Sequence, residues 1–353
     1  MPPNSNDTST GVLFESDVDV GLTKDLVTLR TTDGSKLELV WFNIVLFVIL
    51  HISSLYGVWL LFTEATWTTV LLFPPAVVIT ILGVSGGAHR LWAHRTFKAN
   101  TPLKLIFLFL NTLAFQDAVY YWARDHRVHH KYTETDADPY NSQRGWFFAH
   151  IGWLCCRKHP EVVEKGKQID LSDLEADPLV MFQKKYYLWL MPVICFLLPT
   201  ALPMYLWGES LNTSWHVMAL LRWCVSLNLI WTVNSSAHMF GMKPYDKNIC
   251  PVDQGFLIGF HVGEGYHNYH HVFPWDYKSA ELGPCSQDAT TKFIDFFAYL
   301  GWAYDLKSVS LDMVRQRALR TGDGSHPVWG WGDKDQKSED IGDTTITHQR
   351  KET

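Results

Sequence analysis

The sequence predicts an all-α integral membrane protein with four transmembrane helices and a histidine-rich dinuclear metal site beside them. Hydrophobic residues make up 47% of the 353-residue chain and are concentrated in four blocks, whereas both ends are polar. Eight of the 16 histidines fall in three short clusters just outside these blocks. Apolar blocks of this length are typical of bilayer spans, and clustered imidazoles are typical of transition-metal sites.

The four predicted spans come in two pairs, each joined by a short connection. The turn at 63–66 joins the first pair, and the loop at 208–216 joins the second. Residues 102–115 are also apolar but are too few to cross a bilayer, so an interfacial or re-entrant helix is expected there. The expected spans are 39–62, 67–87, 187–207 and 217–237.

Lysine and arginine positions predict the orientation of these spans. Neither short connection contains a lysine or arginine, whereas fourteen of them lie between Ala88 and Tyr186. By the positive-inside rule, both termini and the long polar loop at 116–186 are expected on the cytosolic side. Every histidine cluster then lies on that side, close to the membrane.

Polar segments flank the predicted membrane domain, which covers residues 39–332. Residues 1–38 are expected to form a cytosolic leader, and residues 333–353 a disordered cytosolic tail. A net charge of −6, without a basic patch interleaved with aromatic residues, excludes a nucleic-acid binder.

Two of the histidine clusters share the spacing H-x-x-H-H. Within each cluster the three rings leave one face of a helix, because residues three and four apart are neighbours on its surface. The remaining pair, His89 and His94, is five residues apart and is expected to diverge on an α-helix, with one ring toward each of two metals. The two full clusters are His126, His129 and His130, and His267, His270 and His271.

Nine imidazoles, counting the isolated His238, are too many for one ion. Two five- or six-coordinate ions could use all nine, and histidine-rich sites with open positions suit iron that activates dioxygen. No cysteine belongs to the clusters, which argues against thiolate zinc and iron–sulfur sites. Nearby acidic residues are candidates for fixing the imidazole tautomers: Asp125, Asp136, Asp138 and Glu264.

The histidine motifs resemble the three histidine boxes of membrane acyl-CoA desaturases of the stearoyl-CoA (delta-9) type, in an insect-type branch. The motifs that carry the resemblance are His89-Arg90-Leu91-Trp92-Ala93-His94-Arg95, Arg124-Asp125-His126-Arg127-Val128-His129-His130-Lys131 and Gly263-Glu264-Gly265-Tyr266-His267-Asn268-Tyr269-His270-His271. The resemblance extends from about residue 11 to 335. It implies four spans, a cytosolic helical cap and a di-iron (Fe²⁺) centre.

The same resemblance implies ligands and substrate contacts. One iron would take His89, His130, His238, His267 and His271, and the other His94, His126, His129 and His270, with Asn234 acting through a water. Contacts with the acyl-CoA headgroup would come from Asn43, Arg124, Asp125, Arg157, Lys158 and Trp231. Two features depart from the family pattern: Asp117 stands where many relatives have asparagine, and the segment 283–289 differs from its usual composition.

The function implied is oxygen-dependent insertion of a cis double bond, at the delta-9 position, into saturated fatty acyl-CoA at the endoplasmic reticulum membrane. Electrons would come from cytochrome b5 and its NADH reductase, since no strand-linked G-x-G-x-x-G appears in the chain. Two alternatives stay open: a fatty-acyl or sterol hydroxylase using the same iron site, and a metal transporter or sensor. Transport calls for ionisable residues within the spans, where Arg222 is the clear example.

Overall fold

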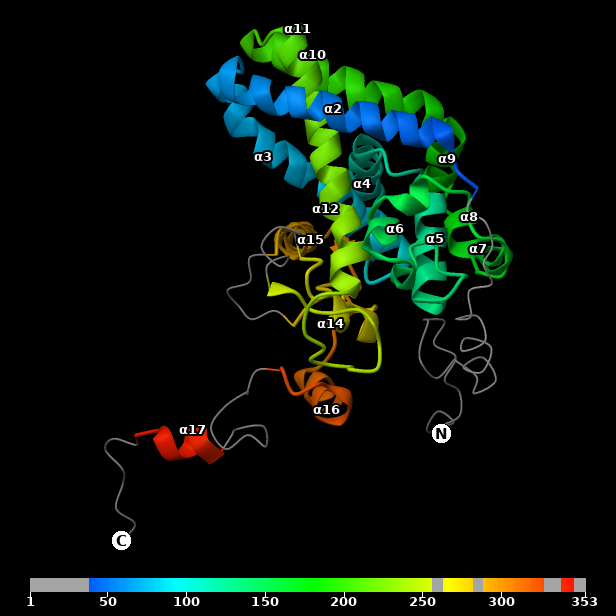
Figure 1. Ribbon diagram of the computed structural model, residues 1–353, viewed down its shortest axis with the longest axis vertical. Coiled ribbons are helices and arrows are strands. Elements are labelled where there is room, and N and C mark those ends of the chain that lie inside the picture. Colours follow the sequence, from blue (N-terminus) through cyan, green and yellow to red (C-terminus); the bar gives the residue numbers. More distant parts are fainter. Residues whose placement is uncertain (1–37, 256–262, 282–287, 327–337, 346–353) are drawn as a thin grey trace.

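The protein consists of a bundle of long apolar helices with a helical cap at one end (Figure 1). The computed structural model describes residues 38–255, 263–281, 288–326 and 338–345. The predicted leader, apart from Glu38, lies outside these residues. So does most of the predicted tail, in which α17 (Ser338–Asp343) is nevertheless a short helix where the sequence predicted disorder.

Four helices are long and apolar enough to cross a membrane, so the predicted four-span architecture is confirmed. They are Trp41–Thr63, Trp67–Ala93, Pro178–Trp207 and Leu211–His238. The third begins nine residues before its predicted start at 187, because Asp177 caps the helix by accepting from Leu179 N, and Pro178 occupies its first turn. Hydropathy alone misses this extension, because it contains the charged residues Lys184 and Lys185.

The first span is the single α-helix α2 (Trp41–Thr63). The other three spans change helix type along their length. The second joins α3 (Trp67–Leu82) to the π-helix η2 (Gly83–Ala93). The third comprises α9 (Pro178–Met191), η5 (Pro192–Leu197) and α10 (Leu198–Trp207). The fourth comprises α11 (Leu211–Thr213), η6 (Ser214–Leu221), α12 (Arg222–Ser235) and η7 (Ser236–His238).

The second and fourth spans form the centre of the bundle. About half of their most apolar stretch is buried (50% and 56%), compared with 28% in the first and third spans, which present their apolar side chains to lipid. Arg222 of α12 is buried among neutral acceptors and donates to Thr80 Oγ1 (2.9 Å), Leu113 O (3.2 Å) and Cys195 O (2.8 Å). This guanidinium therefore links the second, third and fourth spans to α4.

At the end of the bundle away from the cap, Glu209 joins the two short turns. Its carboxylate accepts from Thr66 N (2.9 Å), Thr66 Oγ1 (2.8 Å) and Thr69 Oγ1 (2.5 Å). Burial alone raises the pKa of Glu209, but the hydrogen bonds from Thr69 and Thr66 outweigh burial and lower it.

The cap is helical, as the family resemblance implied. The composition of residues 116–186 alone indicated a polar loop, because these helices bury polar side chains and so lack a simple apolar stripe. They are α5 (Val119–Lys131), η3 (Ser142–Arg144), α6 (Trp146–His150), η4 (Gly152–Leu154), α7 (Pro160–Gly166) and α8 (Ser172–Glu175). The remaining elements are β1 (Lys98–Ala99), α4 (Thr101–Ala114), α14 (His267–Val272), α15 (Ala289–Tyr299), β2 (Ala303–Tyr304) and α16 (Leu311–Thr321).

The main core of the cap lies where α4, α5, η2, α9 and α15 meet, around the fully buried Phe107. The antiparallel pair β1–β2 ties the start of α4 to the end of α15. In Figure 1, α12 runs from the bundle into the cap and ends near α14, while α6 packs beside it. This arrangement brings the ends of the second and fourth spans together with α5 and α14.

Candidate metal centre

The first histidine pair lies at the end of the π-helix η2, with His89 inside the helix and His94 at its C-cap. His94 N donates to His89 O (3.0 Å), the i→i+5 bond that defines this helix type. Residues five apart therefore lie on one face, and the rings of His89 and His94 converge to 4.8 Å between centroids. The predicted divergence of this pair was wrong, because it assumed an α-helix. Gly83 admits the close approach of α4 to η2, since a Cβ there would lie 2.3 Å from Leu110 C.

The second cluster lies on α5 and divides between two directions. His126 and His130 are four residues apart, about 40° around the helix, whereas His129 is about 100° from His130. The Nε2 atoms of His94 and His126 lie 2.8 Å apart, which places His126 on the side of η2. His129 instead faces His238 at the end of the fourth span, with 5.0 Å between ring centroids.

The third cluster, on α14, divides in the same way. His267 and His271 are four residues apart and join His238, with Nε2–Nε2 distances of 2.9 Å (His267 to His238) and 3.1 Å (His271 to His267). His270 points to the other side, where its Nε2 lies 3.0 Å from that of His89 and 3.1 Å from that of His130.

Together the nine predicted histidines form two neighbouring groups, in each of which the ligand atoms lie within 4.8 Å of one another. This grouping differs from the partition implied by the family resemblance, which separates His126 from His130. Since His130 also stacks on His271 of the second group, with 4.1 Å between ring centroids, the assignment of ligands to the two ions stays a prediction. The first group is His89, His94, His126, His130 and His270, and the second is His129, His238, His267 and His271.

The distances within the groups fit transition-metal ions. Ligands about 2.1 Å from one ion lie about 3.0 Å apart at right angles and about 3.4 Å apart in a tetrahedron. The close Nε2–Nε2 distances, 2.8 to 3.1 Å, match the right-angled arrangement of five- and six-coordinate ions. Five donors in one group and four in the other leave positions open for water or a small reactant.

Five of the rings are in the protonation state that metal ligation requires. Burial, followed by repulsion among neighbouring imidazoles, holds the pKa of five of them well below 6.5, so these rings are neutral. Neutral imidazole offers a lone pair to a metal. The five rings are those of His94, His126, His130, His270 and His271.

Carboxylates orient three of the ligands through Nδ1. His129 Nδ1 lies 2.8 Å from Asp138 Oδ1, His238 Nδ1 2.8 Å from Glu134 Oε1, and His89 Nδ1 3.3 Å from Glu264 Oε2. An Nδ1–H donated to a carboxylate leaves Nε2 free to bind a metal. The sequence pointed to Asp138 and Glu264 but missed Glu134, whose left-handed backbone (φ 62°) brings it back toward the cluster.

Arg90 supports this arrangement from within η2, and sequence reasoning did not single it out. Its fully buried guanidinium donates to Glu264 Oε1 (3.1 Å), Asp288 Oδ2 (3.3 Å) and Tyr277 O (2.9 Å). Burial alone raises the pKa of Glu264, but the charges of His89 and Arg90 outweigh burial and lower it to about 2. The carboxylate beside His89 is therefore ionised.

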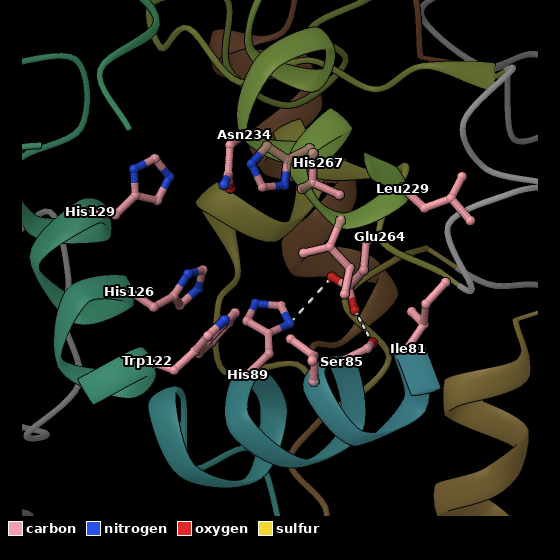
Figure 2. A pocket seen from close by; sticks show the side chains of 13 residues that line it. Ile81, Ser85, His89, Trp122, His126, His129, Leu229, Asn234, Glu264 and His267 are labelled. Atoms are coloured by element: carbon pink, nitrogen blue, oxygen red, sulfur yellow. Dashed lines mark hydrogen bonds and ion pairs between the residues drawn. The ribbon is translucent and has the colours of Figure 1, made fainter. Parts of the chain in front are cut away.

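A pocket opens beside the two histidine groups (Figure 2). Its polar lining includes Glu264, which is joined to His89 and Ser85, and Asn234 near His267. The rest of the wall is apolar and comes from the second span, α5 and the fourth span: Ile81, Val84, Trp122, Leu229, Ile230 and Val233. Asn234, the predicted ligand through a water, thus faces the space next to the histidines.

Most of the predicted substrate residues gather around the loop that follows η4. Asn43 donates to Leu154 O (2.7 Å) at the start of α2. Asp125 pairs with Arg124 (2.8 Å) and with Lys158, so it stands outside the ligand shell. Arg157, three-quarters exposed, pairs with Glu38 (3.1 Å).

The sixth predicted substrate residue, Trp231, is buried in α12 and packs edge-on against Phe47, with 5.4 Å between ring centroids. Asp117, between α4 and α5, has a left-handed backbone (φ 80°), and its carboxylate accepts from Ala118 N (2.7 Å). Burial raises the pKa of this carboxyl group. In the divergent segment 283–289, residues up to 287 lie outside the described part of the chain, whereas Asp288 caps α15.

The amino-acid sequence is similar to those of known proteins. A sequence model of the family described as "Fatty acid desaturase" matches residues 65–282. An "Acyl-CoA Delta-9 desaturase" and an "Acyl-CoA Delta12-desaturase" of Acheta domesticus are each 53% identical to the chain, over 99% of both chains in each case. An "Acyl-CoA Delta(11) desaturase" of Trichoplusia ni is 50% identical over 94% of both. With four spans and two buried histidine groups at their ends, the chain belongs to the fatty acid desaturase family.

Proposed function

We propose that this protein is an oxygen-dependent acyl-CoA desaturase that introduces a cis double bond, at carbon 9, into a saturated acyl chain. The observation that carries the proposal is the pair of histidine groups next to a largely apolar pocket. The reaction balances as saturated acyl-CoA plus O2, two electrons and two protons, giving the unsaturated acyl-CoA and two waters. Two iron ions held by the nine histidines would supply the oxidant that removes hydrogen from two adjacent methylene groups.

The pocket suits a methylene chain. Its aliphatic and indole walls offer dispersion contacts, and a hydrocarbon has no polar group to leave unpaired there. Because a saturated chain lacks features that hydrogen bonds could recognise, the position of the double bond depends on how far the chain enters the pocket. Ile230 and Val233 of α12 stand on this wall and belong to the surface that sets the register.

The other end of the substrate carries phosphates and suits the polar cluster near the membrane surface. Arg124, Arg157 and Lys158 provide cationic groups within one short region, and guanidinium and ammonium groups bind phosphate. Asn43 lies at the start of the first span, where its amide can bind a polar part of the coenzyme. Trp231 and Asp125 complete the proposed substrate contacts.

The two electrons require an external donor, which we infer to be cytochrome b5 with its NADH-dependent reductase. The sequence holds no dinucleotide-binding fingerprint that would let the chain reduce itself from NADH. The distribution of lysine and arginine supports placing both termini and the metal centre in the cytosol, at the endoplasmic reticulum membrane, where such a donor could dock.

The decisive test is expression in a yeast that lacks its own delta-9 desaturase, followed by mass-spectrometric location of double bonds. Growth without added unsaturated fatty acids, with new delta-9 products, is expected. His129→Ala should abolish both, because it removes a ligand and leaves Asp138 without its imidazole partner. His216→Ala is the matched control, since His216 lies in η6 outside both groups and contacts Asn212 O.

The products decide among the remaining possibilities. Double bonds at carbon 11 or 12 would support desaturase activity but reject the delta-9 assignment. These two positions are tested because similar proteins are named Delta12 and Delta(11) desaturases. An alcohol in place of an alkene would reject desaturation in favour of the hydroxylase. Iron-loaded protein that makes neither product from a broad panel of acyl-CoAs would overturn the proposed function.

A further inference from the structure

The helices α4 and α15 form an antiparallel pair beside the end of the second span. Asn100 N, at the cap of α4, donates to Trp302 O just after α15 (2.9 Å), and the rings of Phe107 and Phe293 lie 5.6 Å apart between centroids. Figure 1 shows α15 nearly end-on while α2 runs across the picture, so α15 lies crosswise to that span.

Among the described residues, the outer side of this pair exposes five large apolar side chains, with Lys292 and Asp295 also exposed on α15. We call it the α4–α15 face; it consists of Leu105, Phe109, Phe296, Tyr299 and Leu300. Their exposed fractions run from 41% for Phe109 to 88% for Tyr299. Exposed large apolar side chains gathered on neighbouring helices often mark an interaction site in proteins.

We propose that the α4–α15 face rests in the membrane interface on the side of the metal centre, with lipid as its partner. The face continues the lipid-facing surface of the second span: Ile79 of α3 is exposed, and the next turn, through Ile81, packs against α4 and α15. A helix that lies crosswise to the spans with one apolar side has the geometry of an interfacial helix.

The residue types on the face also favour lipid over a protein partner in water. Tyrosine is enriched at membrane–water boundaries, where its ring sits among the acyl chains and its hydroxyl among the headgroups. Tyr299 stands at the C-terminal end of α15, beside the partly exposed Trp302. The sequence predicted an interfacial helix at 102–115 but gave no sign that α15 shares the surface.

This contact would act on the metal centre through the first turn of α15. Thr290 Oγ1 lies 3.0 Å from Ser85 Oγ, and Thr291 Oγ1 accepts from Arg90 (3.1 Å). Ser85 and Arg90 both hold Glu264, the carboxylate beside His89. A membrane surface that fixes α15 thereby fixes the polar network on one side of the first histidine group.

The test places a photoreactive phenylalanine analogue, p-benzoylphenylalanine, at position 296 or 299 of the full chain. Each variant, loaded with metal, is reconstituted into phosphatidylcholine vesicles with deuterated acyl chains and irradiated, and adducts are counted by mass spectrometry. Position 79 on α3 is the lipid-exposed reference. Position 163, an exposed valine on α7, is the matched reference for an apolar residue in water.

Lipid adducts at 296 and 299 are expected to approach the yield at position 79 and to exceed the yield at position 163 about tenfold, because an interfacial ring lies among acyl chains. A yield equal to that at position 163 would overturn the proposal. Crosslinks to a second copy of the chain in place of lipid would also overturn it, since the occupant of the face would then be protein.

Discussion

Replacing Asn268 with alanine should release the metal from the third histidine cluster while leaving all nine ligands in the sequence. Asn268 is fully buried in α14, between His267 and His270 in the chain. Its Oδ1 accepts from Tyr245 N (2.9 Å) and Asp246 N (3.1 Å). Its Nδ2 donates to Asp246 O and Pro251 O, both at 2.9 Å. One side chain thus anchors the ligand helix to the loop 245–251.

The expected cost follows from these four hydrogen bonds. Each is worth about 1 kcal/mol net, and more where a buried backbone group is left without a partner, so the loss is about 4 kcal/mol. That is a large share of a typical folding free energy of about 5–15 kcal/mol. The six residues of α14 are too few to remain helical without such anchors. We therefore expect misplaced histidines and a melting temperature about 5–10 °C lower.

The assay is metal content per protein together with thermal unfolding in detergent. Asn212→Ala is the control, since Asn212 makes one exposed hydrogen bond to the Tyr56 hydroxyl (3.0 Å) at the opposite end of the spans. We expect Asn212→Ala to keep both the metal and the melting temperature of the parent. An Asn268→Ala protein that also keeps both would refute the argument that this amide holds the ligand helix in place.

Three further changes test other parts of the structure. Glu264→Gln keeps the size of the side chain but removes the negative charge that Arg90 and His89 face. Metal affinity, measured by chelator competition, is expected to fall about 10–100-fold, the usual effect of losing a partner of a metal ligand. Unchanged affinity would show that the charge is dispensable. Arg222→Met should remove the donor to Leu113 O and Cys195 O and lower the free energy of unfolding by about 2–4 kcal/mol, seen as a lower melting temperature. An unchanged melting temperature would mean that the spans relax to pair these carbonyl groups in another way. Glu209, whose pKa lies below the ordinary 4.5, stabilises the fold fully above pH 4.5 and loses that contribution as the pH falls through its lowered pKa. In pH-dependent melting curves, Glu209→Gln should therefore be less stable than the parent at pH 6 and should lose less stability below pH 4.5. An equally steep decline in both proteins would contradict this role.

The sequence predicted the membrane architecture because each span must present apolar side chains to lipid over its whole length. Even the third span, whose start at Pro178 is masked by Lys184 and Lys185, was recognised from its apolar remainder. Lys184 lies over the Tyr120 ring, 3.3 Å from its centroid, so its charge is accommodated by the cap and not by the membrane. Local composition shows the charge but not this partner.

The supporting residues of the metal centre could not be predicted in the same way, because their partners are distant in the sequence. Glu134 is 104 residues from His238, and Arg90 is 174 residues from Glu264. Each appears in the sequence as an ordinary charged residue in a polar stretch. What makes each of them functional is burial, because a buried charge needs a partner.

The division of the histidines shows most directly what a local pattern contains and what it omits. In each H-x-x-H-H cluster the outer pair, four residues apart, serves one group, and the middle histidine serves the other. On α5 the pair joins the first group, whereas on α14 the pair joins the second, so each helix contributes ligands to both groups. The spacing sets the 100° angle between neighbouring rings. Only the placement of α5 against α14, with η2 and η7 at the span ends, decides which ring meets which group. A one-residue deletion in either cluster would therefore disturb both groups at once, whereas losing His94 alone would remove a ligand from the first group only.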